Sequence, residues 1–560
     1  MKTIWTIFVL LLVSCSSIKH KQAQGNKYII ATQGPYSSKA AKQMFDLGGN
    51  AFDAAVAASF VISVERPQST GIGGGGFLVG LKAGDNIPFS YDFREKAPFK
   101  AHKNMYLNKK GEEIKGKSIN GIHAAGVPGL VAGILEVHNK FGTLPLETVM
   151  KPSIHLASNG FKVYPELEKA LKYRKDVLGK YPASKKIFFK NDKEVLKTGD
   201  LLIQKDLAKT LTIISKIGRD GFYKGSVAQA IINESKRLKG PITKKDLIKY
   251  NVKKRAPVKG SFRGHEIYSM APPSSGGVHV IQILNILENY NLEKIGHGNA
   301  KSIHLTASAM QRAFADRATF LGDADFVKVP VDGLTSKKYA KLLKNTIIEN
   351  KAKTSSDIGA GKPFDYESNE TTHFTIADSK GNVVSSTQTI NGYFGSAVTV
   401  PGTGIILNNE MDDFATKVGA KNLYGAIGGN KNLVEPEKRP LSSMSPTIVM
   451  KDGKWKMALG TPSGTRILTC VAQTILNYLE YKMDLKNAVA ATRIHHQWAP
   501  DEIRIENPGF SSKVENNLKS MGYKINHKNL GCRIQALSNE NNILVGVSDH
   551  RGEGLALSEK

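Results

Sequence analysis

Two threonines form the candidate nucleophilic site of this chain, and strand pairing brings them together. Residues 371–378 and 383–389 have the composition of two β-strands joined by a tight turn. If that turn is centred on its two middle residues, facing residues have numbers that sum to 761, and Thr389 lies opposite Thr372. The Thr389 hydroxyl then lies within one residue of Thr371. A threonine hydroxyl can act as a covalent nucleophile when a base activates it. Taken alone, however, the pair is interpreted as ordinary cross-strand packing.

Two glycine-containing stretches have the spacing of nucleotide-binding motifs but the wrong surroundings. In residues 111–118 (Gly-Glu-Glu-Ile-Lys-Gly-Lys-Ser), two glutamates stand where backbone amides should meet phosphate, and the flanks are typical of a hairpin turn. Residues 71–76 (Gly-Ile-Gly-Gly-Gly-Gly) follow Pro-Gln-Ser-Thr instead of a hydrophobic strand, which argues against a dinucleotide fold. The four successive glycines still indicate that the backbone passes very close to another part of the molecule.

The composition is that of a large globular protein. The chain has 560 residues, of which 41% are hydrophobic and 23% charged, so a stable core is expected without a disulfide framework. Lys and Arg number 78 against 49 Asp and Glu, which gives a formal net charge of +29. Because the lysines are scattered and lack interleaved aromatic residues, we interpret this charge as general surface and expect no nucleic-acid partner.

The first residues are typical of an export signal. Lys2 precedes a short apolar run, residues 4–13, which is shorter than the about 20 residues that a membrane span needs. Residues 12–15 (Leu-Val-Ser-Cys) resemble a bacterial lipobox, so we expect residues 1–14 to be removed and Cys15 to carry a lipid. The alternative is an ordinary signal peptide with an incidental cysteine. We predict an exported, periplasmic or cell-surface protein that is attached to a membrane only through this lipid.

The remaining cysteines and the histidines give little support for a metal site. Cys470 and Cys532 could be joined in an exported protein, and the sequence leaves their pairing open. The chain has no Cys-x-x-Cys motif and no His or Cys pair at metal-ligand spacing. We therefore expect neither a metal ion nor another cofactor.

The elements that position these residues can be assigned in outline. Apolar residues at helical spacing predict a helical region over 38–64, broken at Gly48-Gly49. Further helices are predicted over residues 151–159 (with Pro152 at the first helical position), 206–217 and 338–348. Residues 262–270 and 372–389 are predicted strands. Residues 351–370 are polar and contain Gly and Pro, as an exposed and cleavable connection does.

Six short motifs occur along the chain and together resemble one enzyme family. They are residues 73–77 (Gly-Gly-Gly-Gly-Phe), 92–95 (Asp-Phe-Arg-Glu), 272–277 (Pro-Pro-Ser-Ser-Gly-Gly), 368–373 (Ser-Asn-Glu-Thr-Thr-His), 408–413 (Asn-Asn-Glu-Met-Asp-Asp) and 440–446 (Pro-Leu-Ser-Ser-Met-Ser-Pro). In type and order they resemble the γ-glutamyltransferase family of N-terminal nucleophile (Ntn) hydrolases, from about residue 28 to about residue 551. The resemblance implies an α+β fold, the four-layer αββα sandwich of that superfamily, formed jointly by two subunits as one domain.

The resemblance also implies that the precursor cleaves itself between Glu370 and Thr371. The products would be a large subunit, residues 15–370, and a small catalytic subunit, residues 371–560, which stay together as a heterodimer. Thr371 would then carry both a hydroxyl and a free α-amine. The reference pKa of an α-amine, about 8, lets it serve as a base at neutral pH.

By the same resemblance, Thr371 attacks the γ-amide carbon of a γ-glutamyl compound and Thr389 positions it. Backbone amides of Ser463 and Gly464 would hold the oxyanion. Residues 460–464 (Gly-Thr-Pro-Ser-Gly) have a serine where the family usually has Gly-Gly. Because a backbone N–H is the donor, serine should be tolerated there unless its φ must be positive.

Substrate recognition is implied for six residues. Arg94 matches the family's carboxylate-binding arginine, and a guanidinium can hold a carboxylate with two hydrogen bonds. The hydroxyl partners that match are Ser442 and Ser443, and the residues that match those receiving the α-amine are Asn391, Glu410 and Asp413. Taken alone, Arg94 fits a surface ion pair equally well, and Asp413 fits a helix cap.

Residues 417–435, which contain Tyr424, resemble the family's lid loop, which limits the access of water and bulky acceptors. We therefore predict a γ-glutamyltransferase and glutathione hydrolase, with water, an amino acid or a peptide as acceptor. One alternative is a related acylase for glutaryl-type side chains, although such substrates lack the α-ammonium that Glu410 and Asp413 would bind. Another is an uncleaved Ntn scaffold that binds ligands without catalysis.

Overall fold

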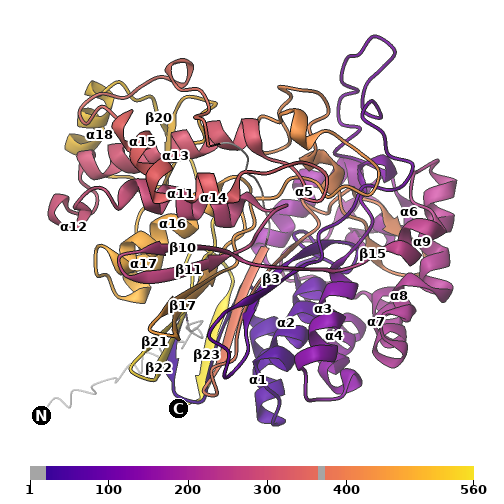
Figure 1. The fold of residues 1–560 in the computed structure, drawn as a ribbon. Helices are drawn as coiled ribbons and strands as arrows, with labels where there is room; N and C mark the ends of the chain where they lie inside the picture. Colours follow the sequence, from indigo (N-terminus) through magenta and orange to yellow (C-terminus); the bar gives the residue numbers. More distant parts are fainter. Residues whose placement is uncertain (1–20, 364–371, 560) are drawn as a thin grey trace, which may run out of the picture.

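Two antiparallel sheets of seven strands each form the centre of the molecule. The computed structural model describes residues 21–363 and 372–559. Sheets A and B pack face to face, and helices cover the outer face of each (Figure 1). The four-layer αββα sandwich predicted from the sequence is therefore confirmed.

Both sheets combine strands from the two sides of the undescribed segment 364–371. In spatial order, sheet A consists of β1 (Gln22–Gly25), β22 (Ile543–Ser548), β21 (Gln535–Glu540), β17 (Lys454–Gly460), β16 (Thr447–Lys451), β11 (His265–Ser269) and β10 (Val258–Phe262). Sheet B consists of β23 (Leu555–Glu559), β2 (Tyr28–Thr32), β12 (Thr372–Asp378), β13 (Val383–Thr389), β3 (Gly75–Leu81), β4 (Phe89–Asp92) and β9 (Lys253–Arg255). Each sheet is thus complete only when both segments are present.

The helices form one layer on each sheet. Sheet B is covered by α1 (Pro35–Asp46), α2 (Ala51–Glu65), α3 (Leu130–Phe141), α4 (Leu146–Asn159) and α7 (Lys205–Ile217). Sheet A is covered by α11 (Ser275–Leu287), α13 (Ala300–Phe320), α15 (Lys337–Asn345) and α16 (Arg466–Leu479). Every side chain of α2 and of α11 is buried, which places these two helices at the centre of their layers.

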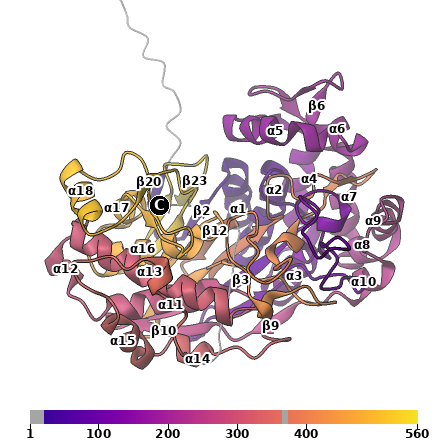
Figure 2. The ribbon, with the colours of Figure 1, turned by 90° about the horizontal axis from the view of Figure 1, so that it is seen from above.

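The remaining elements lie at the periphery. The helices are α5 (Pro165–Leu178), α6 (Pro182–Phe188), α8 (Asp220–Tyr223), α9 (Gly225–Arg237), α10 (Lys244–Lys249), α12 (Leu292–Ile295), α14 (Val331–Leu334), α17 (Leu485–Ala490) and α18 (Ser512–Ser520). The short strands are β5 (Phe161–Lys162), β6 (Phe189–Lys190), β7 (Glu194–Val195), β8 (Leu201–Leu202), β14 (Thr399–Val400), β15 (Ile405–Ile406), β18 (Ile494–His495), β19 (Ile503–Ile505) and β20 (Ile525–His527). Figure 2 shows α5, α6 and β6 standing out from the body of the molecule.

The predicted break at Gly48-Gly49 separates α1 from α2. Asn50 caps α2, because its side chain accepts the backbone N–H of Phe52 at 2.8 Å, while Asp53 accepts the N–H of Asn50 at 2.9 Å. This reciprocal pairing satisfies amides that the helix itself leaves unpaired. The apolar face between the sheets, in contrast, holds residues from distant segments, such as Phe77 and Leu537.

The predicted register of the hairpin formed by β12 and β13 was wrong by one residue. Strands β12 and β13 pair with a sum of 760, from Ala377 opposite Val383 to Thr372 opposite Gln388. The reason is a three-residue loop instead of a two-residue turn, closed by Asp378 and ending at Gly381, whose φ is 99°. The Asp378 carboxylate accepts two backbone N–H groups of the loop at 3.0 and 3.1 Å, which stabilises this wider form.

Three other predicted elements differ from the structure. Residues 262–270 are not one strand, because Arg263 and Gly264 have φ of 48° and 76° and form a two-residue turn between β10 and β11. Helix α4 begins at Leu146, so Pro152 lies inside it, and buried side chains on both sides of the proline hold that helix in the core. Helix α15 ends at Asn345, three residues before the predicted end.

The glycine run packs against neighbouring backbone, as the sequence predicted. A Cβ added at Gly74 would lie 1.8 Å from the carbonyl oxygen of Thr389, and one at Gly73 would lie 2.1 Å from that of Ile406. A side chain at Gly74 would push the end of β13 away, and one at Gly73 would collide with β15. The glycines therefore serve the close packing of the strand that carries Thr389.

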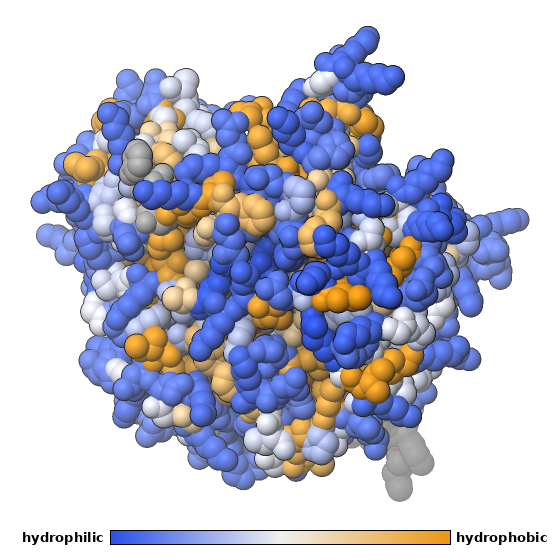
Figure 3. Space-filling model, turned by 45° about the vertical axis from the view of Figure 1, so that its right-hand side comes forward, coloured by the Kyte–Doolittle hydropathy of each residue, from blue (hydrophilic) through white to orange (hydrophobic). Residues whose placement is uncertain are grey.

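The surface is largely hydrophilic on the face shown in Figure 3, where hydrophobic side chains form small separate groups. Within residues 21–363 and 372–559, no helix combines the length and hydrophobicity that crossing a membrane requires. The predicted signal and lipid-attachment residue, 1–14 and Cys15, lie outside the described residues.

Candidate active site

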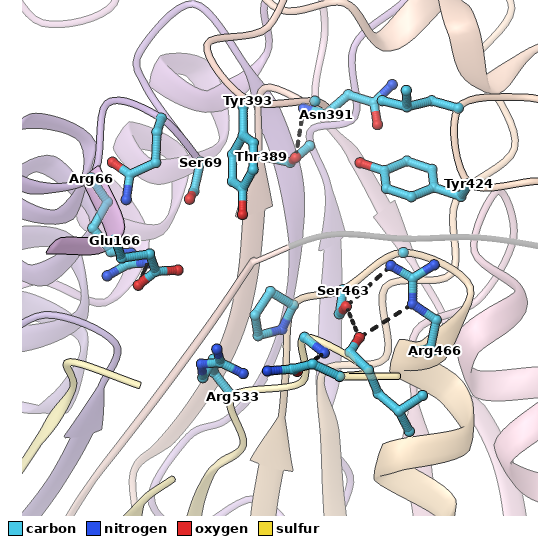
Figure 4. Close-up of a pocket in the computed structure, with 18 of the residues that line it drawn as sticks. Arg66, Ser69, Glu166, Thr389, Asn391, Tyr393, Tyr424, Ser463, Arg466 and Arg533 are labelled. Atoms are coloured by element: carbon cyan, nitrogen blue, oxygen red, sulfur yellow. Dashed lines mark hydrogen bonds and ion pairs between the residues drawn. The ribbon is translucent and has the colours of Figure 1, made fainter. Parts of the chain in front are cut away.

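A pocket of about 540 Å³ brings together six of the residues predicted from the sequence. Its walls include Thr389, Asn391, Glu410, Tyr424, Ser463 and Gly464. They come from the end of β13, the segments that follow it, and the loop between β17 and α16. Figure 4 shows Thr389 and Ser463 facing each other across the centre of this pocket. The predicted cleavage residues Glu370 and Thr371 lie outside the described residues.

Thr389 is held at the end of β13 with its hydroxyl already engaged. Its Oγ1 accepts the backbone N–H of Asn391 at 2.7 Å, and its strand partner is Gly75. The Asn391 side chain in turn donates to the carbonyl oxygen of Asn409 at 3.0 Å. These bonds fix the start of the loop that follows β13, directly beside the segment that contains Glu410.

The loop of Ser463 and Gly464 adopts the conformation that a serine tolerates poorly. Ser463 has φ of 119° and Gly464 has φ of 63°, so both lie in the region that favours glycine. The Ser463 hydroxyl donates to the carbonyl oxygen of Leu530 and accepts from Arg466 at 3.3 Å. Ser463 is therefore a strained residue whose side chain is anchored to the segment that contains Leu530.

Arg94 is fully buried and holds two of the predicted recognition carboxylates. Its guanidinium donates to Glu410 and, at 2.7 Å, to Asp413. It also donates to the carbonyl oxygens of Pro440 and Leu441, both at 3.3 Å. The carboxylate of Glu410 lines the pocket, whereas Arg94 and Asp413 lie outside the pocket wall.

Ser442 and Ser443 directly follow the two carbonyl groups that Arg94 contacts. Both are fully buried and lie outside the pocket wall. The backbone of Ser442 pairs with the segment before α11, since it donates to Pro273 O at 3.0 Å and accepts from Ser275 N at 2.9 Å. Backbone hydrogen bonds thus hold Ser442 and Ser443 next to the carbonyl groups that Arg94 contacts, outside the pocket wall.

A third carboxylate, Glu95, belongs to this cluster and was not singled out from the sequence. Its carboxylate lies 4.0 Å from the Arg94 guanidinium and is fully buried. Burial raises the pKa of Glu95 to about 7, although the charge of Arg94 opposes this. Burial, and then repulsion from Glu95 and Asp413, also raises the pKa of Glu410. Its position next to Arg94 in the motif at 92–95 was the only signal in the sequence.

The predicted lid residue lies over the pocket. Tyr424 lines it, and its ring lies under the Arg466 guanidinium with 5.8 Å between the guanidinium carbon and the ring centroid. Two neighbouring lid residues bind the acidic segment, since Asn422 donates to Asp413 at 2.9 Å and the Leu423 N–H donates to Asp412 at 2.8 Å. The predicted lid segment is therefore bonded directly to Asp412 and Asp413, beside Arg94.

A disulfide joins Cys470 on α16 to Cys532. It settles the pairing that the sequence left open. Cys532 immediately follows pocket residues 528–531, and Arg533 beyond it also lines the pocket. The bridge thus ties this wall to the helix that follows the Ser463 loop.

Comparison with known proteins agrees with the geometry. The family model for γ-glutamyltranspeptidase matches residues 37–558. A glutathione hydrolase proenzyme of Escherichia coli strain K12 is 46% identical over 506 residues, which cover 90% of this chain and 87% of that protein. A protein of the same name from Pseudomonas aeruginosa is 41% identical over 537 residues, covering 95% and 94%.

Solved structures show the same relationship. The γ-glutamyltranspeptidase of Helicobacter pylori is 47% identical, with a TM-score of 0.58, over 59% of this chain and 94% of that one. A cephalosporin acylase from Bacillus halodurans has a TM-score of 0.85 over 99% and 100% of the two chains, and at 23% identity it shows the shared fold alone. From the family match across nearly its whole length and these relatives, we conclude that this chain belongs to the γ-glutamyltranspeptidase family.

Proposed function

We propose that this protein is a γ-glutamyltransferase and glutathione hydrolase that matures by cleaving itself between Glu370 and Thr371. One observation carries the proposal: Glu410 contributes a buried carboxylate to the pocket that also holds Thr389 and the Ser463 loop. Its Oε1 is bound by Arg94, and its Oε2 accepts no N–H or hydroxyl group of the described residues. An α-ammonium group can donate to this carboxylate, which otherwise shares a hydrogen bond only with the neighbouring carboxyl group of Glu95.

In the proposed maturation, the Thr371 hydroxyl attacks the carbonyl carbon of Glu370. The Thr371 nitrogen leaves as the new α-amine, and water hydrolyses the ester that joins the two subunits. The freed amine then takes the proton of the Thr371 hydroxyl in each catalytic cycle. The polar connection before the cut supports this step, since in its described part, residues 351–363, six residues are exposed and only two are buried.

In the proposed reaction, Thr371 attacks the γ-amide carbon of a γ-glutamyl donor and expels the amine of the leaving group. Backbone N–H groups of Ser463 and Gly464 stabilise the oxyanion, and the Thr389 hydroxyl positions the nucleophile. The acyl-enzyme is resolved by water in hydrolysis or by the amine of an amino acid or peptide in transfer. Positive φ at both loop residues supports this role, because it turns consecutive amides into an anion-binding concavity.

In the proposed recognition of the donor, Arg94 binds the α-carboxylate and the acids around it bind the α-ammonium. Ser442 and Ser443 complete the carboxylate side, while Asn391 and Asp413 complete the ammonium side. The existing pairing of Arg94 with Glu410 and Asp413 supports this assignment. A zwitterionic head group can replace that internal pairing with matched contacts of its own.

We further propose that residues 15–370 and 371–560 are the mature subunits and that Cys15 carries the lipid of an exported protein. The disulfide between Cys470 and Cys532 supports export, since such bonds persist in oxidising compartments.

Release of a chromogenic aniline from a γ-glutamyl anilide by the purified protein tests the proposed reaction, with Thr371→Ala as control. We expect release by the wild type and none by Thr371→Ala. A cleaved wild type that releases no aniline would contradict the γ-glutamyl substrate class. In that case a glutaryl anilide tests the acylase alternative. That alternative is worth testing because the acylase ACY 1 proenzyme of Pseudomonas sp. strain SE83 is 37% identical to this chain.

A further inference from the structure

The side of the pocket away from Tyr424 and Arg466 carries the guanidinium of Arg533, which forms no ion pair with the residues that the structure describes. Figure 4 shows Arg533 there, on the same side as Arg66 and Glu166. Lys528 also lines the pocket. Nothing in the sequence patterns marked Arg533 or Lys528 as functional.

Arg66 and Glu166 neutralise each other. Arg66 donates to the Glu166 carboxylate at 2.8 Å, and its side chain is only 3% exposed. Burial alone would raise the pKa of Glu166. The charge of Arg66, with a weaker contribution from Arg533, instead holds that pKa below its ordinary value. Glu166 is therefore ionised and already satisfied by Arg66.

Arg533 has no such partner. Its guanidinium donates to the carbonyl oxygen of the preceding Cys532 at 2.9 Å, and its Nε is buried without a hydrogen-bond partner among the described residues. It forms no ion pair with any residue in the ranges 21–363 and 372–559, and the same is true of the exposed Lys528. An arginine with unused donors on a pocket wall is suited to bind a carboxylate.

The backbone of Arg533 is firmly held, so its side chain is presented from a rigid support. The Arg533 N–H donates to Thr461 Oγ1 at 2.7 Å, and its carbonyl oxygen accepts from Gln535 at 3.1 Å. Cys532 is bridged to α16, and Leu530 accepts the Ser463 hydroxyl. A preorganised donor loses little freedom when it binds a ligand.

We propose that Arg533, assisted by Lys528, binds the free carboxylate of the leaving group and of the peptide acceptor. This inference rests on the proposed function. The γ-glutamyl head group lies towards Glu410, and the leaving amine departs from the acyl carbon near Thr389 and Ser463. The rest of a leaving peptide extends to the other side, where Arg533 lies. An acceptor attacks the same carbon along the reverse path, so it uses the same carboxylate site.

The preferred donors are thus γ-glutamyl peptides whose leaving group ends in a carboxylate. Two chromogenic donors that differ only in this feature test the site: L-γ-glutamyl-4-nitroanilide and L-γ-glutamyl-3-carboxy-4-nitroanilide. For each, kcat/KM is measured with the purified, self-cleaved wild type and with Arg533→Gln. Arg533→Lys keeps the positive charge but lacks the planar guanidinium that can donate two hydrogen bonds to one carboxylate. Lys513→Gln is the control for loss of one charge outside the pocket, at an exposed position on α18.

We expect Arg533→Gln to lower the ratio of kcat/KM for the carboxylated donor over the plain donor about tenfold, through loss of a charge-assisted hydrogen bond. Arg533→Lys should retain part of the ratio, and Lys513→Gln should match the wild type. An unchanged ratio in Arg533→Gln overturns the carboxylate site, including the case in which both donors lose activity equally. If the wild type cleaves neither donor, the proposed function itself fails and this inference fails with it.

A pair of acceptors that differ only in a carboxylate tests the role of Arg533 in acceptor binding. Glycylglycine carries the carboxylate, and glycylglycinamide does not. We expect the wild type to prefer glycylglycine in transfer and Arg533→Gln to lose that preference. Equal preference in the two proteins would contradict the role of Arg533 in acceptor binding.

Discussion

Arg94 shows how the residues of the recognition cluster depend on one another. Its buried guanidinium faces three buried carboxylates, those of Glu95, Glu410 and Asp413, and the charge of Arg317 also acts on Asp413. If all three were ionised, the cluster would carry excess negative charge in a medium that solvates it poorly. Burial accordingly raises the pKa of each carboxyl group. The cluster is thus prepared to accept the positive charge of a substrate ammonium.

Replacement of Arg94 should separate substrate binding from maturation. We expect Arg94→Ala to raise KM for γ-glutamyl substrates on the order of a hundredfold, because two hydrogen bonds to a charged group are lost. Self-cleavage should survive, since the guanidinium has no part in the proposed attack by Thr371. Steady-state kinetics and a denaturing gel measure both. Arg94→Lys, which keeps the charge, should have an intermediate KM, and a folded but uncleaved Arg94→Ala protein would count against this division of roles.

Glu95 predicts a pH dependence of binding near neutrality. Burial raises the pKa of Glu95 to about 7, and because Glu95 shares a hydrogen bond with Glu410, the two carboxyl groups lose a proton as a pair when the pH rises through that value. An ammonium group binds the ionised form, so KM for a γ-glutamyl donor should rise as the pH falls through about 7. Glu95→Gln, which cannot titrate, should flatten this part of the KM profile. An identical profile in Glu95→Gln would assign the titration to another group.

The loop between β17 and α16 is the element whose backbone matters most. Ser463 is held at φ of 119°, and its hydroxyl links this loop to Leu530. Strand β17 and helix α16 support the two ends of the loop, and the disulfide from α16 fixes the facing segment. The element as a whole, rather than any one side chain, therefore sets the direction of the two proposed oxyanion amides.

Two substitutions at Ser463 isolate the backbone strain. Ser463→Ala and Ser463→Gly both remove the hydroxyl, but only alanine keeps a Cβ in the left-handed region, at a cost of about 1–3 kcal/mol. We expect Ser463→Gly to unfold at a higher temperature than Ser463→Ala and to retain more kcat. Thermal scans and anilide kinetics on both variants measure this. The reverse order would show that φ at this position is not a source of strain.

On the scale of the whole molecule, the two sheets unite the proposed subunits. Strands β2 and β3 flank the hairpin of β12 and β13, while β10 and β11 extend a sheet whose other strands are mostly from the C-terminal part. The apolar layer between the sheets also mixes both parts. Separation of the subunits would expose this layer and the edges of both sheets.

Cleavage should therefore leave the molecule intact. We expect a denaturing gel to show two chains that elute together as one species in native gel filtration. Elution as two separate species would contradict the shared sheets as the cause of association. Thr371→Ala, which should stay as one chain, gives the matched elution volume of the uncleaved protein.

Much of this fold could be predicted from the sequence, because local residue patterns determine many of its helices and strands. The break between α1 and α2, helix α7 and the hairpin of β12 and β13 follow from periodicity and turn composition. The extra loop residue at Gly381 was missed, since it depends on how the Asp378 side chain closes the turn. The interior position of Pro152 was missed because packing in the core outweighs the loss of one helical hydrogen bond.

The sequence by itself determined the family and its α+β sandwich, because several specific motifs occur in order over most of the chain. Only the tertiary structure decided which charges meet. Glu95 joins Arg94 and Glu410, Ser463 is forced to a positive φ, and Arg533 forms no ion pair within residues 21–363 and 372–559. The physical reason is that pairing and strain depend on contacts between segments far apart in the chain, 316 residues for Arg94 and Glu410 and 67 for Ser463 and Leu530, and no local pattern of residue types records them.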